Sequence, residues 1–339
     1  MRYLNPRIIK MLAATSAACM FCFASAAHAE ADKIKVGTQF GLAYLPLVLM
    51  ESDHIWEKNA KALGVDVNVD YARLGGGSAL NDALISSSVD VVAGGFAPML
   101  VMWDKTQTSF KVKALAALNA SPVDILANRP QVQNLKDFTE DDRIAVPSIR
   151  TSIQAIVLMA AAEKEFGPGQ AGKLDNQTVA MQHPDATAAL GIDKSPIAGY
   201  VSSSPFQEML LKNPKISKVT DSYKVFGGPT TLSVSYAKDS FSKNNPLLTK
   251  AFYTSLDEAF AMIKKDPEGA IAKYKAVTGD RTDSALLLET IKSPDCIYGS
   301  TPMATLKMAE LMNRVGILKS SPTSWKDYFT EQSYAYPGN

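Results

Sequence analysis

The sequence is poor in cysteine and histidine, with three residues of each among 339. Two of the cysteines, Cys19 and Cys22, lie in an N-terminal segment that we expect to be removed, so only Cys296 remains and no internal disulfide is expected. The two histidines outside that segment, His54 and His183, are far apart in the chain. We therefore expect neither a zinc site nor a redox-active Cys-x-x-Cys pair.

Several catalytic motifs are also missing. The chain has no His-Glu-x-x-His pair, no Gly-x-Ser-x-Gly nucleophile elbow and no Asp-x-Asp-x-Asp-Gly calcium loop. The run Gly75-Gly76-Gly77-Ser78 lacks the Gly-Lys-Ser/Thr ending of a phosphate-binding P-loop. The formal net charge of +1 gives no basic excess for a nucleic-acid surface. We expect no enzyme activity, no cofactor, no metal and no nucleic-acid partner.

The first 29 residues have the features of an export signal. A basic start is followed by the apolar run 11–23 and by the small-x-small sequence Ala27-His28-Ala29. The run is shorter than the roughly 20 residues that span a bilayer, so we expect cleavage after Ala29 and a periplasmic protein. The segment holds Arg2, Arg7 and Lys10 and no acidic residue; 35 basic residues less these three leave 32 against 34 acidic, a net charge of −2 for residues 30–339.

The remaining chain alternates between segments typical of strands and segments typical of helices. Short alternating or apolar runs predict strands at 33–39, 65–74, 89–93, 111–118, 123–128, 143–147, 178–183, 197–201 and 230–237. Helical patterns lie between them, such as the Ala-rich stretch 153–166, and nearly everything after Asn244 reads as helix. This order predicts an α/β fold with mostly parallel sheets. Residues 78–98 and 183–205 follow the same order of elements, which suggests an internal repeat.

Small and polar turns follow five of the predicted strands, at 41–44, 75–78, 94–98, 148–152 and 202–205. In an open parallel sheet such turns gather at the carboxyl edge, where ligands bind. Where a turn opens a helix, free backbone N–H groups favour an anion. Arg150 lies inside one of these turns and has a side chain that can pair with a carboxylate or a sulfonate. Tyr44, Phe96 and Phe206 are candidates for apolar walls.

Three groups of residues resemble one family of binding proteins. They are the stretches 41–49 and 75–80 with Val89-Asp-Val-Val; Arg143-Ile-Ala-Val-Pro147 with Thr151-Ser152; and Gly228-Pro229-Thr230 with Lys238-Asp239. Together they resemble the nitrate/sulfonate/taurine-type periplasmic substrate-binding proteins of ABC importers. The resemblance implies a two-lobed, type II-like periplasmic-binding-protein fold with a sheet flanked by helices in each lobe and two crossover strands. It also implies lobe 1 at 33–122 plus 230–339, lobe 2 at 123–229, a hinge closure, and a monomer that delivers a small solute to an inner-membrane permease.

The resemblance also places Ser78, Phe96, Ala97, Ser121, Thr151 and Ser152 at the cleft. With the turn residues, the expected substrate-binding set is Gly41, Tyr44, Gly77, Ser78, Phe96, Ala97, Ser121, Arg150, Thr151, Ser152, Ser202 and Ser203. Two departures from the family, Ser202-Ser203-Ser204 where an aromatic is usual and Leu232 where taurine binders carry an acid, argue against taurine. A sulfonate, nitrate, an aromatic carboxylate and a pyrimidine remain open as solutes. Two other functions stay open: a pyrimidine-precursor synthase-like enzyme of thiamine biosynthesis, and a receptor for a membrane sensor.

Overall fold

The computed structural model describes residues 30–193 and 195–339, so the expected export signal lies outside the described residues. Residues Ala31–Asn339 form one compact unit that contains two β-sheets. The first, sheet A, has the strand order β11-β4-β10-β3-β1-β2. Its strands are β1 (Lys33–Thr38), β2 (Asn68–Arg73), β3 (Val91–Gly95), β4 (Val112–Ala120), β10 (Thr231–Lys238) and β11 (Ile297–Tyr298). β1 pairs in parallel with β2 and β3, whereas β10 runs antiparallel to both β3 and β4.

Sheet B repeats this arrangement with the order β7-β6-β8-β5-β9. Its strands are β5 (Asp124–Ala127), β6 (Arg143–Val146), β7 (Thr178–Ala180), β8 (Ile197–Ser202) and β9 (Ser217–Asp221). β6 pairs in parallel with β7 and β8, and β5 runs antiparallel to β8 and β9. The run β2-β1-β3-β10-β4 therefore corresponds to β7-β6-β8-β5-β9, which is the repeat that the sequence suggested.

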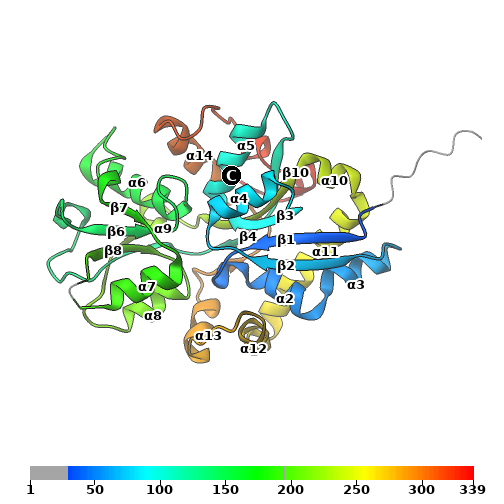
Figure 1. The fold of residues 1–339 in the computed structure, drawn as a ribbon, viewed down its shortest axis with the longest axis horizontal. Helices are drawn as coiled ribbons and strands as arrows, with labels where there is room; N and C mark the ends of the chain where they lie inside the picture. The colour runs from blue at the N-terminus through cyan, green and yellow to red at the C-terminus, as the bar shows by residue number, and fades with distance from the viewer. Residues whose placement is uncertain (1–29, 194) are drawn as a thin grey trace, which may run out of the picture. The chain divides into compact units, whose positions relative to one another are not determined.

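Helices cover both faces of each sheet (Figure 1). In sheet B, α7 and α8 lie on one face and α6 and α9 on the other. In sheet A, α4 packs on β3 and α5 on β4, while α11 packs on α2 and α3. The helices are α2 (Leu45–Asp53), α3 (Ile55–Ala62), α4 (Gly77–Ile85), α5 (Phe96–Thr106), α6 (Ile153–Phe166), α7 (His183–Gly191), α8 (Phe206–Leu211), α9 (Ser222–Phe226), α10 (Asp239–Asn244), α11 (Pro246–Lys265), α12 (Pro267–Thr278), α13 (Ser284–Lys292) and α14 (Thr305–Arg314), with short 3-10 turns η2 (Leu42–Tyr44), η3 (Leu135–Asp137), η4 (Asp175–Gln177), η5 (Trp325–Asp327) and η6 (Glu331–Ala335).

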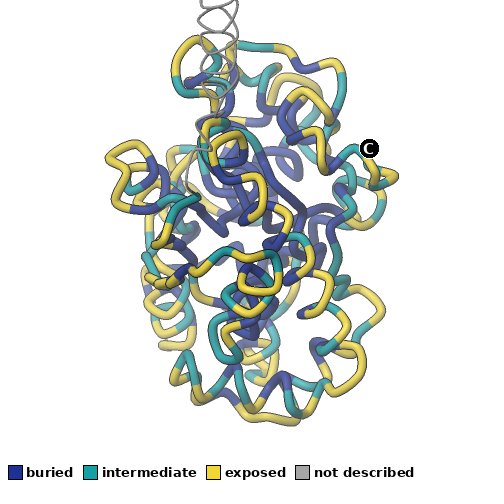
Figure 2. Tube along the Cα trace, turned by 90° about the vertical axis from the view of Figure 1, so that its right-hand side faces the viewer, coloured by how far each residue is buried: buried dark blue, intermediate teal, exposed yellow. Residues whose placement is uncertain are grey.

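The core follows the hydrophobic pattern of the strands. In β1, Ile34 and Val36 are fully buried while Lys33 and Lys35 are exposed, as the alternation predicts. Figure 2 shows the buried stretches inside and the exposed ones on outer turns. The face of sheet B under α7 and α8 has its own small cluster, with Leu126, Tyr200 and Leu210 among its members. Among the described residues, no helix combines the length and apolarity needed to cross a membrane.

The helices after β10 pack back on the side of sheet A. α11 and α12 contact α2, and the C-terminal segment reaches the sheet, where Phe329 forms a parallel bridge with Ala114. The indole Nε1 of Trp103 in α5 donates to the carbonyl of Asp327 at 3.1 Å. α13 and α14 also contact α8 and α6, respectively.

The chain passes between the two sheets twice, from β4 to β5 through residues 121–123 and from α9 to β10 through residues 227–230. All strands of sheet B therefore fall within residues 124–221, and those of sheet A lie before and after them. The lobe limits at 122 and 230 stay predictions, since the whole of Ala31–Asn339 is one compact unit.

Two local expectations were wrong. The expected turn at Gly94–Pro98 is absent, because β3 continues to Gly95 and α5 begins directly at Phe96. The strand expected at 178–183 ends at Ala180, and His183 is instead the first residue of α7. Pro184 accounts for the second difference, since its fixed φ suits the first helical turn. In contrast, the Ala-rich helix α6 has the bounds that the sequence predicted.

Candidate functional site

Four helices begin directly after parallel strands of the two sheets. α4 and α5 follow β2 and β3 of sheet A, and α6 and α7 follow β6 and β7 of sheet B. Their first residues are Gly77, Phe96, Ile153 and His183. α4, α5 and α7 lack a side-chain cap from the residue that precedes them, so their first-turn N–H groups are not satisfied in that way. Each helix places the positive end of its dipole at the carboxyl edge of its sheet.

A cavity of about 20 Å³, hereafter the inner cavity, lies where these helix starts meet. Turns and helix starts of both sheets line it: Gln39, Phe40, Gly41, Ala43, Tyr44, Gly77, Gly95, Pro98, Pro147, Ser152, Ile153, Gln154, His183, Ser203, Ser204 and Leu232. No lysine, arginine, aspartate or glutamate is among these residues. Any charge that the inner cavity receives is therefore met by helix ends and neutral hydrogen-bonding groups.

Gly41 brings the first turn of sheet A against the last turn of sheet B. The N–H of Leu42 donates to the carbonyl of Ser204 at 3.2 Å. Gly41 has φ 118°, and a Cβ at this position would lie 3.1 Å from the same carbonyl oxygen. Only glycine adopts this conformation without strain. The side chain of Tyr44, at the end of the same turn, donates its hydroxyl to Oε1 of Gln39 at 2.7 Å.

His183 forms the wall of the inner cavity on the sheet B side. Its Nε2 lies 3.3 Å from Nε2 of Gln154 and 3.5 Å from Oγ of Ser203, and its Nδ1 bonds the hydroxyl of Tyr200. Because the amide nitrogen of Gln154 can only donate, Nε2 of His183 accepts and Nδ1 carries the proton. Burial lowers the pKa of His183 to about 4, so the ring is neutral at pH 7.

Ser152 holds the start of α6 in place. Its hydroxyl accepts from the N–H of Ala155 at 3.2 Å and donates to the carbonyl of Ser148 at 2.7 Å. This N-cap bond fixes the helix end against the inner cavity. Gln154 lies in the first turn of α6, which this cap stabilises.

Several expected residues line the inner cavity and others do not. Gly41, Tyr44, Gly77, Ser152 and Ser203 line it. Ser78 lies beside it, with its hydroxyl 3.4 Å from that of Ser148. The remaining expected residues lie elsewhere: Phe96 and Ala97 are fully buried in the first turn of α5, Ser202 is fully buried in β8, Thr151 donates to the carbonyl of Ile149 at 3.4 Å, and Ser121 donates to Oδ1 of Asn119 at 2.8 Å.

Arg150 does not line the inner cavity. Its guanidinium forms an ion pair with Asp175 and lies 3.5 Å from the carbonyl oxygen of Val315. The side chain is 46% exposed and its backbone has φ 60°. The left-handed conformation lets the turn pass close to the cavity while the charged group points to Asp175. Arg150, which we expected to pair with an anion, thus pairs with Asp175 of η4.

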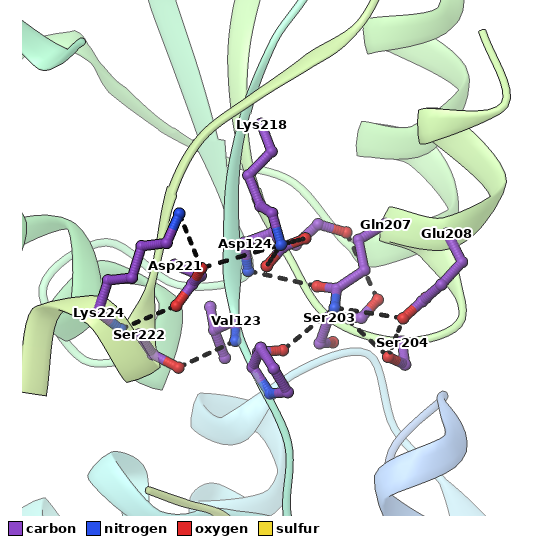
Figure 3. A network of polar contacts seen from close by, with 12 residues as sticks. Val123, Asp124, Ser203, Ser204, Gln207, Glu208, Lys218, Asp221, Ser222 and Lys224 are labelled. Atoms are coloured by element: carbon purple, nitrogen blue, oxygen red, sulfur yellow. Dashed lines mark hydrogen bonds and ion pairs between the residues drawn. The ribbon is translucent and has the colours of Figure 1, made fainter. Parts of the chain in front are cut away.

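A polar network ties the crossing at 121–123 to the wall of the inner cavity (Figure 3). Gln207 accepts from the N–H of Asp124 at 3.3 Å and donates to the carbonyl of Pro122 at 3.2 Å. Its amide also lies 3.4 Å from the hydroxyl of Ser204, which lines the inner cavity. Beside it, the N–H of Val123 donates to the hydroxyl of Ser222 at 3.0 Å. The crossing at 121–123 is therefore bonded both to α8, next to the turn at Ser204, and to the start of α9.

Asp124 is the buried acid of this network, with 2% of its surface exposed. Lys218 lies 3.3 Å from its carboxylate and 3.8 Å from that of Asp221. Burial raises the pKa of Asp124 to about 7, against the opposing effect of Lys218. Glu208 adjoins the network through Ser204, and burial raises its pKa as well. These groups stabilise the crossing and do not line the inner cavity.

Reasoning from sequence missed the residues that make the inner cavity specific, above all Gln39, Gln154 and His183. For His183, at the end of a predicted strand, the sequence left both a structural and a pocket-lining role open, and Gln154 was read only as part of an Ala-rich helix. For Gln154 a signal was present, because it stands at the start of a predicted helix that follows the predicted strand 143–147. Among the described residues, no cluster of histidine, cysteine, aspartate and glutamate is suited to hold a metal ion.

Comparison with known proteins finds relatives in structure but not in sequence. No family model matches the sequence, and no curated protein matches it. Among solved structures, the alkanesulfonate-binding protein SsuA from Xanthomonas axonopodis pv. citri bound to MOPS matches 90% of this chain and 98% of its own, with a TM-score of 0.70 and 16% identity. The periplasmic aliphatic sulphonate binding protein SsuA from Escherichia coli matches 89% of this chain and 93% of its own, with a TM-score of 0.67 and 14% identity.

The periplasmic nitrate-binding protein NrtA from Synechocystis PCC 6803 is a third structural neighbour. It matches 90% of this chain and 88% of its own, with a TM-score of 0.68 and 12% identity. The neighbours are binding proteins, and the matches extend over nearly the whole described chain. With two sheets of matching topology, each flanked by helices, the chain has the fold of the periplasmic binding proteins.

Proposed function

We propose that the protein is the periplasmic solute-binding component of an ABC importer. It binds a small solute with an acidic group at the inner cavity and delivers it to an inner-membrane permease without changing it chemically. The N-terminal segment that we expect to be cleaved after Ala29 agrees with export to the periplasm. The fold, shared with sulfonate- and nitrate-binding proteins, supports the same reading.

The observation that carries the proposal is the convergence of the starts of α4, α5, α6 and α7 on one cavity lined from both sheets. The first-turn N–H groups of α4, α5 and α7, which have no side-chain cap, and the dipoles of all four helices favour an anion. The neutral ring of His183 and the amide of Gln154 add neutral groups, so the acid is bound without a basic side chain among the lining residues. This donor set suits a carboxylate, a sulfonate or nitrate.

Access to the inner cavity requires movement. A cavity of about 20 Å³ holds roughly one water molecule, which is less than an acidic group occupies. The two crossings at 121–123 and 227–230 are the only direct chain connections between the sheets within the described residues. We propose that sheet A and sheet B separate by rotation at these crossings, admit the solute and close on it.

A solute panel tests the proposal. Thermal unfolding is measured with nitrate, acetate, benzoate, methanesulfonate, benzenesulfonate and uracil, and hits are confirmed by calorimetric titration. A true solute at 100 times its Kd stabilises the protein by about 2.7 kcal/mol. No shift with any member, or chemical conversion of one of them, would overturn the proposal.

A pair of glutamine variants locates the binding. Gln154→Ala removes a side chain that lines the inner cavity, and is expected to weaken binding of the confirmed solute by about 1–3 kcal/mol. Gln170→Ala, at an exposed position outside the cavity, is the matched control and is expected to leave affinity unchanged. Equal affinities in the two variants would move the site away from the inner cavity.

A further inference from the structure

A second and larger cavity adjoins the inner cavity. This outer cavity has a volume of about 370 Å³ and shares Gln39, Phe40 and Gly41 with the inner one. Its other walls come from Val48 of α2, Arg73, α7, α8 and the segment from α12 to α13. The turn after β1 is thus a wall of both cavities, and a molecule that extends along this turn can occupy both.

A pair of stacked rings forms the opposite boundary. His183 lines the inner cavity and Phe206 lines the outer one. The two rings are parallel within 5°, with their centroids 5.2 Å apart. A planar group in the outer cavity that packs on Phe206 continues this stack, an arrangement that aromatic rings favour.

The outer cavity also exposes apolar side chains that a soluble protein usually covers. Phe40 is 39% exposed and Met209 is 38% exposed, and both line it. The hydroxyl of Thr282 lies 3.2 Å from the sulfur of Met209, so α8 and the segment before α13 meet across this cavity. Covering this surface with an apolar ring removes it from water and is favourable.

The charged groups of the outer cavity are mostly engaged with the protein. Arg73 forms an ion pair with Glu51. Asp280 accepts from the hydroxyl of Tyr274 at 3.2 Å and from the N–H of Thr282 at 2.7 Å. Arg281 lines the outer cavity and has no ion-pair partner within residues 30–193 and 195–339. Asp280 and Arg281 therefore bring opposite charges to this cavity, and the apolar walls are its main binding surface.

From these observations, and resting on the proposed function, we infer that the solute is an aromatic acid: its acidic group lies at the helix starts of the inner cavity and its ring lies in the outer cavity on Phe40, Phe206 and Met209. The volumes favour this division, because the inner cavity, which must open even for an acidic group, is far smaller than the outer one, and the outer one is within the range of pockets that hold whole small molecules. A nitrate ion leaves the apolar walls of the outer cavity uncovered.

Matched pairs of acids test the inference by calorimetric titration of the mature protein. Benzoate is compared with acetate, and benzenesulfonate with methanesulfonate, so that each pair shares an acidic group and differs by the ring. In at least one pair the aromatic acid is expected to bind ten times more tightly or better. If the small acid of each pair binds as tightly as its aromatic partner, the inference is overturned while the proposed function stands. If none of the four acids binds and nitrate does, the inference is again overturned alone.

Variants separate the two cavities. Met209→Ala, at a partly exposed position that lines only the outer cavity, is expected to weaken binding of the aromatic acid at least threefold and to leave that of its small partner unchanged. Ile85→Ala, at a residue that is 50% exposed and lines neither cavity, is the control and is expected to change neither affinity. An equal effect of Met209→Ala on both acids, or no effect on either, would overturn the placement of the ring.

Discussion

Asp124 is expected to make the protein more stable at low pH than at high pH, which is the opposite of the effect of most acidic side chains. Its pKa is about 7 in the folded protein, against 3.8 for an unperturbed aspartate. The folded state therefore binds a proton that the unfolded state releases between these two values. The stability that comes from this proton is fully present below pH 3.8 and is lost as the pH rises through 7.

The magnitude follows from the shift. A raise of about 3 pKa units corresponds to about 4 kcal/mol between the two ends of this range, at roughly 1.4 kcal/mol for each unit. Lys218, Asp221 and Glu208 are the charged groups that act on the same carboxyl, and Lys218 alone opposes the effect of burial. Asp124→Asn removes the titrating group and keeps a side chain of the same shape. The stability of this variant relative to wild type is expected to fall by about 4 kcal/mol from pH 8 to pH 4.

The comparison with a variant is needed because His183 changes the stability of the protein with pH in the direction opposite to Asp124. Its pKa of about 4 lies below the usual 6.5, so the folded state resists protonation and loses stability as the pH falls from 6.5 toward 4. That loss, about 3 kcal/mol, nearly cancels the gain from Asp124 in the wild-type curve. The difference between wild type and Asp124→Asn isolates Asp124, since His183 is present in both.

The assay is urea unfolding followed by tryptophan fluorescence at pH 4, 5, 6, 7 and 8, with free energies obtained by linear extrapolation. Asp193→Asn is the control, because Asp193 is exposed and pairs with Lys215 on the surface at 2.8 Å. Its difference from wild type is expected to stay within about 1 kcal/mol, as for other surface ion pairs. A difference between Asp124→Asn and wild type that is equally constant from pH 8 to pH 4 would refute the reasoning.

Two further predictions concern the turns. Gly41→Ala is expected to lower the free energy of unfolding by more than 1 kcal/mol and to weaken solute binding, because the new Cβ meets the carbonyl of Ser204. Gly64→Ala is the control for backbone strain alone, since φ is also positive there but nothing lies within 4 Å. Equal unfolding midpoints for the two variants would contradict a clash at Gly41. Arg150→Ala is expected to change the affinity for the confirmed solute less than threefold in calorimetric titration, because Arg150 pairs with Asp175. A loss of binding free energy of about 2 kcal/mol or more would instead show that Arg150 contacts the solute.

Local sequence patterns predicted helices and strands well where the burial of a segment follows from the residues of that segment alone. The alternation of Lys33 to Thr38 predicted β1, and the Ala-rich run from Ile153 to Phe166 predicted α6 with its bounds. The same reasoning brought Gly41, Tyr44, Gly77, Ser152 and Ser203 to one cavity, because small turns after parallel strands meet at one edge of a sheet. The rule needs only the order of the elements and no knowledge of long-range contacts.

The other site residues depend on contacts between distant segments. Arg150 is engaged by Asp175, and nothing in the turn around Arg150 indicates which acid reaches it. The neutral state of His183 results from burial against Phe206 and Tyr200, which belong to another helix and another strand. Phe96 missed the inner cavity because α5 starts without a turn and directs this ring to Tyr328, with centroids 5.7 Å apart. The outer cavity depends on α12 and α13, whose return to the site the sequence did not predict.

The position of β10 also constrains how the chain folds. β10 lies between β3 and β4 in sheet A, and its residue Tyr236 pairs with Ala114 of β4 and Val92 of β3. Neither β3 nor β4 has this neighbour until the chain has run through all of sheet B and come back. Sheet A therefore closes late, through pairings between residues more than one hundred positions apart, and such distant pairings make folding slow. For the exported protein that we propose, slow folding keeps the chain extended for longer, and an extended chain is the state that can be threaded across a membrane.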